Sequence, residues 1–249
     1  MYKFFVPEKQ INENEIYIVG TDVNHISNVL RLKLNDNIII SSKETGKTYI
    51  SEIINFSKDS VICKIINLED ESVESNVNID LYQGLPKSDK MEFIIQKTTE
   101  LGVKSIFPVD MERCVVKIDK KSELKKLERW QKISEVAAKQ SKRDIIPKVE
   151  NIIKIEDICK NTSKYDIILL AYENENTKTI KDELRKLDKN INKNINIGII
   201  IGPEGGFSES EVNKLIEANA KCISLGKRIL RTETAPIVMI SDIIYEFEL

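Results

Sequence analysis

Two patterns of apolar residues divide the chain. From the N-terminus to about residue 73, short β-branched runs separated by polar turns predict strands over residues 38–40, 49–54 and 61–66. One helical segment, residues 24–31, interrupts them. From Val77 onward, strand-like apolar runs alternate with helical patterns. This alternation predicts a mainly parallel sheet covered by helices on both faces.

An acidic and polar stretch, residues 68–76, separates the two patterns. We therefore predict a small β-rich domain over residues 1–73 and an α/β domain over residues 74–249. The second domain should contain strands at 77–83, 105–109, 166–172, 197–201 and 222–225, and helices at 88–101, 179–187, from 208, and 235–247. Residues 188–196 are of low complexity and should form an exposed loop.

Two helices carry apolar residues that need partners. Leu124, Leu127, Trp130, Ile133 and Ala137 form a stripe at helical spacing, which predicts a core-facing helix. In the last helix, apolar residues spread around much of the circumference, which predicts burial on more than one side. That helix either meets a partner or is sandwiched inside one subunit.

Two glycine-bearing loops stand out near the C-terminus. Residues 202–207 (GPEGGF) follow the apolar run 197–201, and residues 225–235 (LGKRILRTETA) follow a shorter run. Ser208 and Glu211 have the spacing of a capping box, which starts a helix directly after the first loop. Each strand end therefore opens into a loop, at the sheet edge where α/β proteins bind ligands.

The chemistry of these loops is that of a small-ligand site. The first loop is neither a GxGxxG fingerprint nor a Walker loop. Its glycines allow the backbone to approach a flat ligand closely. Leu225, Ile229 and Leu230 can supply apolar walls. The sequence identifies no carboxylate placed to bind a ribose.

Composition restricts the partners. The net charge is −2, so RNA binding would depend on local basic patches. The four cysteines are far apart and His25 is the only histidine, so we expect no metal site and a reducing compartment. The apolar N-terminus is too short for a signal peptide, and no run reaches membrane-spanning length. We therefore expect a cytoplasmic protein without membrane contact.

Taken together, the two loops resemble the signature of the bacterial methyltransferases that modify ring nitrogen 3 of a uridine in 16S ribosomal RNA. Both motifs match in the same order near the C-terminus, and a weaker resemblance extends over the whole chain. The resemblance implies a SPOUT-type parallel sheet tied in a trefoil knot, preceded by a PUA-like RNA-binding domain. It also implies a homodimer formed through the last helix, and 16S ribosomal RNA or the small ribosomal subunit as partner.

The resemblance further implies S-adenosyl-L-methionine as cofactor. The residues expected to bind it are Leu170, Ile201, Gly202, Pro203, Glu204, Gly205, Gly206, Leu225, Gly226, Ile229 and Leu230. Arg231 is the catalytic candidate because a guanidinium can stabilise negative charge on a deprotonated uracil. It could equally anchor a phosphate. Glu233 or water is the candidate proton acceptor, and Glu233 could instead be a carboxylate stabilised by the following helix dipole.

Six polar residues are candidates for RNA contacts: His25, Arg31, Arg113, Lys117, Gln140 and Arg143. His25 and Arg31 could also be ordinary surface residues. A basic cluster near residues 140–143 is also what a helix C-terminus favours.

Two other functions remain open. The chain could be another SPOUT methyltransferase, acting on ribose or transfer RNA, or a non-catalytic RNA-binding assembly factor. The intact first loop and Arg231 argue against the non-catalytic interpretation.

Overall fold

The computed structural model describes residues 1–69, 71–175, 177–187 and 194–248, and they form two compact units. The first unit comprises Met1–Glu74 and Ala138–Ile146, and the second comprises Ser75–Ala137 and Pro147–Leu249. The sequence placed 138–146 in the α/β domain. In the structure this segment packs with the N-terminal unit, so neither unit is limited to one continuous stretch.

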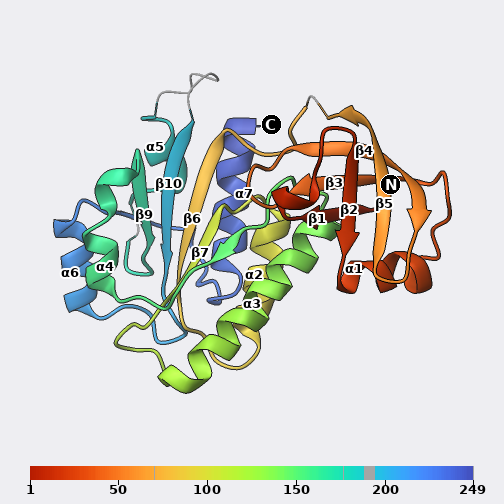
Figure 1. Ribbon diagram of the computed structural model, residues 1–249. Helices are drawn as coiled ribbons and strands as arrows, with labels where there is room; N and C mark the ends of the chain where they lie inside the picture. Colours follow the sequence, from red (N-terminus) through yellow and green to blue (C-terminus); the bar gives the residue numbers. More distant parts are fainter. Residues whose placement is uncertain (70, 176, 188–193, 249) are drawn as a thin grey trace. The chain divides into compact units, whose positions relative to one another are not determined.

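The first unit is built on a five-stranded sheet with the order β1-β3-β4-β5-β2 (Figure 1). β1 pairs with β3 in parallel, and the other neighbours are antiparallel. The three strands predicted from the sequence are confirmed, each longer than its apolar run. The strands are β1 Lys3–Val6, β2 Glu15–Val19, β3 Asn37–Ser42, β4 Thr48–Phe56 and β5 Ser60–Leu68.

The expected helical segment of this unit is α1, Thr21–Asn24, continued by a π-helical turn, His25–Val29. Ile26 points from this turn into the core and is fully buried. The core of the unit consists of side chains from the helix and the strands, among them Phe4, Ile16, Ile38 and Val61.

A buried polar network attaches the segment Ala138–Ile146 to the rest of the first unit. The Asp144 carboxylate, 5% exposed, accepts hydrogen bonds from the ammonium group of Lys3, the hydroxyls of Thr48 and Ser72, and the backbone N–H of Val73. The carboxylate of Glu74 pairs with the Arg143 guanidinium and also accepts the N–H of Asp144 at 2.8 Å. The charged groups are therefore buried as satisfied pairs.

The second unit contains a six-stranded parallel sheet with the order β11-β9-β10-β6-β7-β8, as the alternating pattern predicted (Figure 1). Its inner strand β10 is buried from Ile197 to Ile201, with isoleucines on both sides of Gly198, typical of a strand covered on both faces. The strands are β6 Val77–Gly84, β7 Ser105–Val109, β8 Lys148–Val149, β9 Ile167–Ala171, β10 Ile195–Ile201 and β11 Lys221–Ile223.

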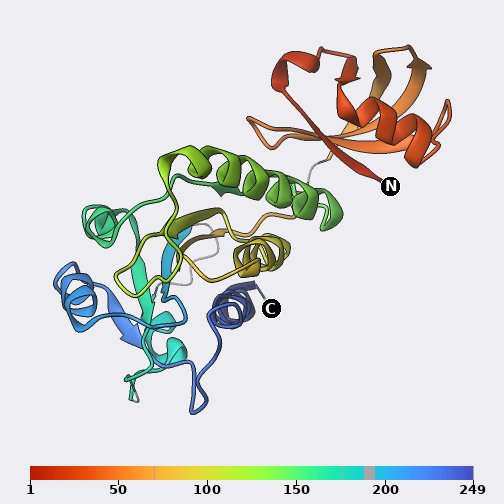
Figure 2. The same ribbon diagram turned by 90° about the horizontal axis from the view of Figure 1, so that it is seen from below.

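Helices lie on both sides of this sheet (Figure 2). α7 packs against α2 and α5 and against strands β6 and β10, whereas α4 packs against α6. The helices are α2 Lys90–Glu100, α3 Lys120–Gln140, α4 Ile155–Cys159, α5 Ile180–Leu184, α6 Glu209–Glu217 and α7 Ala235–Glu248. Residues 188–193 of the expected low-complexity loop lie outside the described residues, and Asn196 already belongs to β10.

One expectation about helix burial needs correction. Leu124 was assigned to a core-facing stripe but is 69% exposed, because it lies in the first turns of α3, whereas Trp130 and Ala137 are buried. In α7, Ile240 and Ile243 are fully buried in the subunit's own core, while Tyr245 is 70% exposed. Packing within the subunit therefore accounts for much of the apolar surface around the circumference of α7.

The parallel sheet gathers several loops at one edge. The segments after β6, β9, β10 and β11 all leave from the carboxyl ends of neighbouring parallel strands. The trefoil knot stays a prediction, because strand order and register do not define how the chain threads. Among the described residues, no helix is both long enough and apolar enough to cross a membrane.

We predict that Asp144→Ala destabilises the first unit by about 3–5 kcal/mol, because it leaves the Lys3 ammonium group buried without its carboxylate. Trp130, the single tryptophan, lies in the second unit. Hydrogen exchange of β1 and β4 should therefore accelerate while the Trp130 fluorescence transition stays in place. The exposed Asp59 provides the control, Asp59→Ala; equal protection in both variants would contradict the prediction.

The same network predicts a pH dependence. Burial alone would raise the pKa of Asp144, but hydrogen bonds from Lys3, Ser72, Val73 and Thr48 hold it below the ordinary value of 3.8. A lowered pKa contributes stability that is present above the ordinary value and lost as the pH falls through the lowered one. The stability gap between wild type and Asp144→Asn should therefore close below pH 3.8, as urea unfolding at a series of pH values would measure.

Candidate functional site

The first glycine loop, residues 202–207, connects the end of β10 to α6. Its helix begins as predicted: the Glu211 N–H donates to the Ser208 hydroxyl at 3.2 Å, and the Ser208 N–H donates to the Glu211 carboxylate at 3.0 Å. Gly206 has φ +66°, and a Cβ there would lie 2.5 Å from a carboxylate oxygen of Glu173. The positive φ therefore favours glycine at this position, and a larger residue would also displace the Glu173 carboxylate.

The second loop forms a pocket with the end of β9. The pocket has a volume of about 140 Å³ and opens beside a larger hollow of about 520 Å³. Glu173, Ile229 and Leu230 line both, so the two spaces adjoin. The remaining lining of the smaller pocket is Ala171, Tyr172, Ser224, Leu225, Gly226, Lys227, Arg228 and Ala235.

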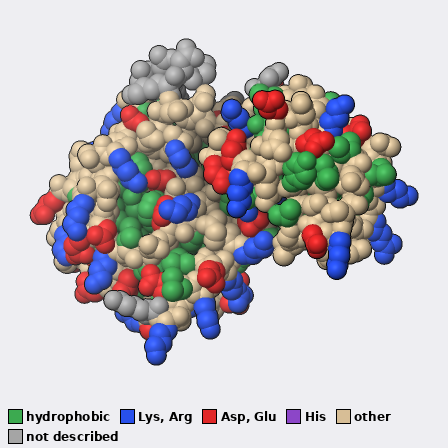
Figure 3. Space-filling model, in the orientation of Figure 1, with side chains coloured by type: hydrophobic (Ala, Val, Ile, Leu, Met, Phe, Trp, Pro, Cys, Tyr) green, Lys and Arg blue, Asp and Glu red, His purple; other side chains and the backbone are tan. Residues whose placement is uncertain are grey.

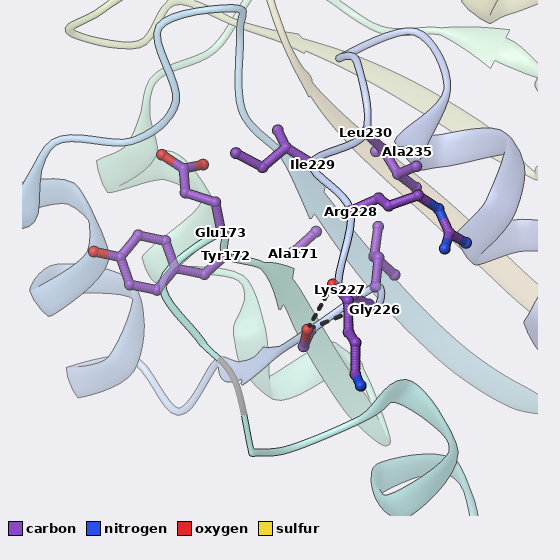
Figure 4. A pocket seen from close by; sticks show the side chains of 11 residues that line it. Ala171, Tyr172, Glu173, Gly226, Lys227, Arg228, Ile229, Leu230 and Ala235 are labelled. Carbon is purple, nitrogen blue, oxygen red and sulfur yellow. Dashed lines mark hydrogen bonds between the residues drawn. The ribbon is translucent and has the colours of Figure 1, made fainter.

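Apolar and acidic groups face this pocket. Figure 4 shows the Tyr172 ring and the Glu173 carboxylate extending from the end of β9, and Ile229 extending from the second loop. Ile229 is 89% exposed and lines both the pocket and the adjoining hollow. The pocket therefore combines an apolar wall with the Glu173 carboxylate and the basic side chains of Lys227 and Arg228, a suitable lining for a ligand with a flat apolar part and polar groups.

A buried hydrogen-bond chain joins the two loops. The side-chain amide of Gln83, at the end of β6, donates to the Thr232 hydroxyl at 3.0 Å. That hydroxyl donates to the backbone carbonyl of Gly202 at 2.7 Å. Gln83 is fully buried and Thr232 is 6% exposed, so water does not compete for these bonds. The second loop is thereby held against the first.

The larger hollow is lined by charged groups. The Arg231 side chain is 82% exposed, and its Nη1 lies 4.0 Å from a Glu233 carboxylate oxygen. The Lys90 ammonium group lies 3.0 Å from Glu233 and 3.0 Å from Glu204. Arg231 is thus available to a ligand, whereas Glu233 is engaged.

The surroundings of Glu233 make it a weak base. Burial alone would raise its pKa, but its own backbone N–H, Lys90 and Arg231 hold the pKa below the ordinary value. Glu233 also stands just before the N-terminus of α7, where a helix dipole favours a carboxylate. Of the two roles open from the sequence, the structure favours the structural carboxylate over the proton acceptor.

The structure brings together most residues expected to bind a cofactor. Pro203, Glu204, Gly205, Gly206, Leu225, Gly226, Ile229 and Leu230 line the pocket or the adjoining hollow. Leu170 and Ile201 do not: both are buried core residues at the ends of β9 and β10. Gly202 contributes its carbonyl to the bond with Thr232 rather than a wall of the pocket.

Tyr172, Glu173 and Lys90 are among the lining residues that sequence reasoning missed. Tyr172 and Glu173 directly follow β9, a strand that was predicted. The rule that ligands bind at the carboxyl ends of parallel strands would have found both. Lys90 carried no signal, because it has the pattern of an ordinary polar residue at the start of a helix.

The expected RNA-contact residues are divided between the two units. His25, Arg31 and Gln140 are exposed on the first unit, and Arg113 and Lys117 are exposed on the second. In the second unit, the Arg113 guanidinium donates to the Gly205 carbonyl at 3.2 Å, and Lys117 pairs with Asp110 at 2.8 Å. Figure 3 shows Lys and Arg intermixed with Asp and Glu over the face it displays.

Arg143 needs correction as an RNA-contact residue. It is 5% exposed, and its guanidinium is paired with the carboxylate of Glu74 inside the first unit. A residue buried in this way cannot reach a phosphate without breaking the network around Asp144. Its role is to fasten the segment Ala138–Ile146.

Comparisons with known proteins place this geometry in a family. A family model described as an RNA methyltransferase domain matches residues 73–244, and one described as an RNA methyltransferase PUA domain matches residues 19–66. The first covers well over half of the chain, so the chain belongs to this family of RNA methyltransferases. The expected PUA-like N-terminal domain and the α/β class of the C-terminal domain are confirmed.

Individual relatives are similar over their full length. Ribosomal RNA small subunit methyltransferase E of Bacillus subtilis (strain 168) is 38% identical, over 100% of this chain and 98% of the relative. The structure of the enzyme of that name from Neisseria gonorrhoeae, bound to S-adenosyl methionine, is 31% identical with a TM-score of 0.86 and covers 99% of this chain and 98% of its own.

A methyltransferase structure from Legionella pneumophila with the bound cofactor SAM is 28% identical. Its TM-score is 0.84, and it covers 98% of this chain and 97% of its own. Among the described residues of the present chain, no group of three or more His, Cys, Asp or Glu side chains could hold a metal ion.

Proposed function

We propose that this protein methylates ring nitrogen 3 of a uridine in 16S ribosomal RNA of the small subunit, using S-adenosyl-L-methionine, in the cytoplasm. The main support is the pocket between the end of β9 and the second loop, which adjoins a hollow lined by both loops, with Gly206 packed against Glu173 and the apolar wall of Ile229. The family, and relatives named as small-subunit ribosomal RNA methyltransferases, support the reaction class.

The residues present fit this cofactor. S-adenosyl-L-methionine supplies a methyl group on a positively charged sulfonium. Ile229 and Leu230 provide the apolar surface for the adenine. The Glu173 carboxylate complements the positive charge of the ligand or accepts hydrogen bonds from the ribose hydroxyls. Gly226 has φ +108°, and a Cβ there would meet nothing within 4 Å, so this loop leaves open space beside the pocket.

Arg231 is the residue we assign to the chemical step. The imide nitrogen of uridine is protonated, so it must lose its proton and its ring must then carry negative charge. Arg231 is exposed at the hollow that adjoins the pocket, and its guanidinium stays charged at any working pH. It stabilises that charge electrostatically. Because the Glu233 carboxylate is paired with Lys90 and its pKa is held low, we assign removal of the imide proton to water.

The alternative is another SPOUT methyltransferase that acts on ribose or transfer RNA. Mapping 16S ribosomal RNA by mass spectrometry from a strain lacking the gene separates the two. We expect one N3-methyluridine to disappear and to return on complementation, whereas the transfer RNA modifications stay unchanged. An unaltered 16S map would refute the proposed substrate.

We also propose a homodimer that uses the outer face of α7. Ile237, Val238 and Ile244 are only partly buried and Tyr245 is 70% exposed, which leaves an apolar strip on a helix otherwise packed into the core. Ile240 is fully buried and cannot test this interface, since Ile240→Asp would disrupt the subunit itself.

For the cofactor site, Gly206→Val should abolish S-adenosyl-L-methionine binding while the fold survives. The valine would be strained at φ +66° and would displace the Glu173 carboxylate. Isothermal titration calorimetry measures the loss. Gly20→Val is a matched control, because Gly20 also has positive φ but lies in the first unit, where a Cβ would meet no atoms within 4 Å. Normal binding by Gly206→Val would place the cofactor elsewhere.

For the chemical step, Arg231→Ala should keep cofactor affinity and lose turnover by about 10²–10³-fold, the range for loss of one charge-stabilising group. Arg231→Lys should recover only part of the rate, because it keeps the charge without the planar fork. The alanine variant should regain relative activity as the pH rises, since uracil deprotonation becomes easier. Single-turnover rates near wild type would remove Arg231 from the mechanism.

For assembly, Tyr245→Asp should shift the protein from dimer to monomer, because it introduces a charge into the apolar strip. Light scattering at micromolar concentration measures the mass, and circular dichroism verifies the fold. Leu124→Asp, another exposed apolar residue of the same unit, should leave the mass unchanged. A monomeric wild-type protein would disprove the dimer.

A further inference from the structure

Lys90 connects the two glycine loops, both of which lie far from it in sequence. It is the first residue of α2, and its ammonium nitrogen lies 3.0 Å from Oε1 of Glu204 and 3.0 Å from Oε2 of Glu233. Glu204 belongs to the first glycine loop and Glu233 to the second. Both carboxylate oxygens touch one nitrogen, so they are no farther apart than twice this distance.

The residues just before α2 also bind the first loop. The backbone N–H of Lys87 donates to both oxygens of Glu204, at 3.1 and 3.3 Å. The buried bonds from Gln83 through Thr232 to Gly202 hold the loops at their base, and Lys90 holds them at the rim of the hollow. These two attachments are independent, because they use different atoms of both loops.

The charges around Lys90 show what it offsets. Three carboxylates, Glu173, Glu204 and Glu233, belong to the hollow or its border. Two further cations are near: Arg231, 82% exposed and 4.0 Å from Glu233, and Arg113, which donates to the Gly205 carbonyl at 3.2 Å. Without Lys90, Glu204 and Glu233 would face each other as like charges at short range, which is unfavourable.

We propose that Lys90 is a positioning residue that keeps the two loops in their cofactor-binding arrangement by neutralising the repulsion between Glu204 and Glu233. This inference rests on the proposed function, since it takes the space between the loops as the cofactor site. It gives Lys90 no contact with the reacting atoms.

If Lys90 acts by neutralising charge, the effect of removing it depends on pH. An effect of packing alone does not. In wild type, burial would raise the pKa of both carboxyls, but Lys90 and backbone N–H groups hold both below their ordinary value. Removing Lys90 removes one of the groups that lower these pKa values, so the pKa values of Glu204 and Glu233 both rise. Lowering the pH then protonates one carboxyl, relieves the repulsion and restores the arrangement.

The experiment compares Lys90→Met, Lys90→Arg and the double variant Lys90→Met/Glu204→Gln by calorimetry with S-adenosyl-L-methionine at about pH 8 and about pH 5.5. We expect Lys90→Met to lose about tenfold in affinity at the higher pH, the equivalent of one pKa unit. It should recover at the lower pH, relative to wild type measured in parallel. The arginine variant should bind nearly as wild type at both. At the higher pH, the double variant should bind more tightly than Lys90→Met.

Lys97→Met is the matched control. Lys97 lies on the same helix and is also ion-paired, but with Glu100 on its own helix, at 3.0 Å. It should bind as wild type. Wild-type affinity in Lys90→Met at both pH values would overturn the inference. A loss that neither the low pH nor the double variant restores would also overturn it, because Lys90 would then contact the ligand directly.

A readout without ligand separates this inference from the proposed function. At one pH near 8, Lys90→Met should accelerate amide hydrogen exchange in residues 202–207 and 225–235, and Lys97→Met should not. If wild type binds no S-adenosyl-L-methionine, the proposed function fails, and the exchange result still decides whether Lys90 holds the loops. Unchanged exchange in Lys90→Met would refute its positioning role.

Discussion

The site depends on one buried interaction, the hydrogen-bond chain from Gln83 through Thr232 to the Gly202 carbonyl. It joins the end of β6 to both glycine loops in a place that water does not reach. A hydrogen bond of this kind adds little net stability, but leaving its groups unpaired would be costly. The second loop must therefore return to the sheet at this position, which brings Ile229 and Arg231 beside Gly206 and Glu173 and forms the pocket.

The first unit uses the same physical constraint for another purpose. Asp144 and Arg143 belong to the middle of the chain and are buried with polar partners. Lys3, Thr48 and Ser72 bind the Asp144 carboxylate, and Glu74 pairs with the Arg143 guanidinium. A buried pair costs desolvation, so it gives specificity more readily than stability. Here the buried pairs join the segment Ala138–Ile146 to the rest of the unit. Arg143, which the sequence suggested as an RNA contact, is therefore a structural residue.

Charge arrangement distinguishes the roles of the polar residues at the site. Arg231 is exposed and can meet a substrate, whereas Glu233 is partly buried and bound by Lys90. A carboxylate held ionised in this way is a poor proton acceptor, since efficient bases have a pKa near the working pH. At the hollow, the site therefore combines the exposed Arg231 with carboxylates that Lys90 largely neutralises.

The sequence by itself determined much of the local structure: period-two and continuous apolar runs predicted most of the strands, Ser208 and Glu211 the start of α6, and the glycine loops the position of the candidate site. These features depend on near neighbours in the chain. Only the tertiary structure decided that Arg143 is buried, that Ile240 packs inside its own subunit, and that Glu173 and Lys90 reach the loops. Each of these depends on residues far apart in sequence, and burial and ion pairing follow from distances in space that no local pattern encodes.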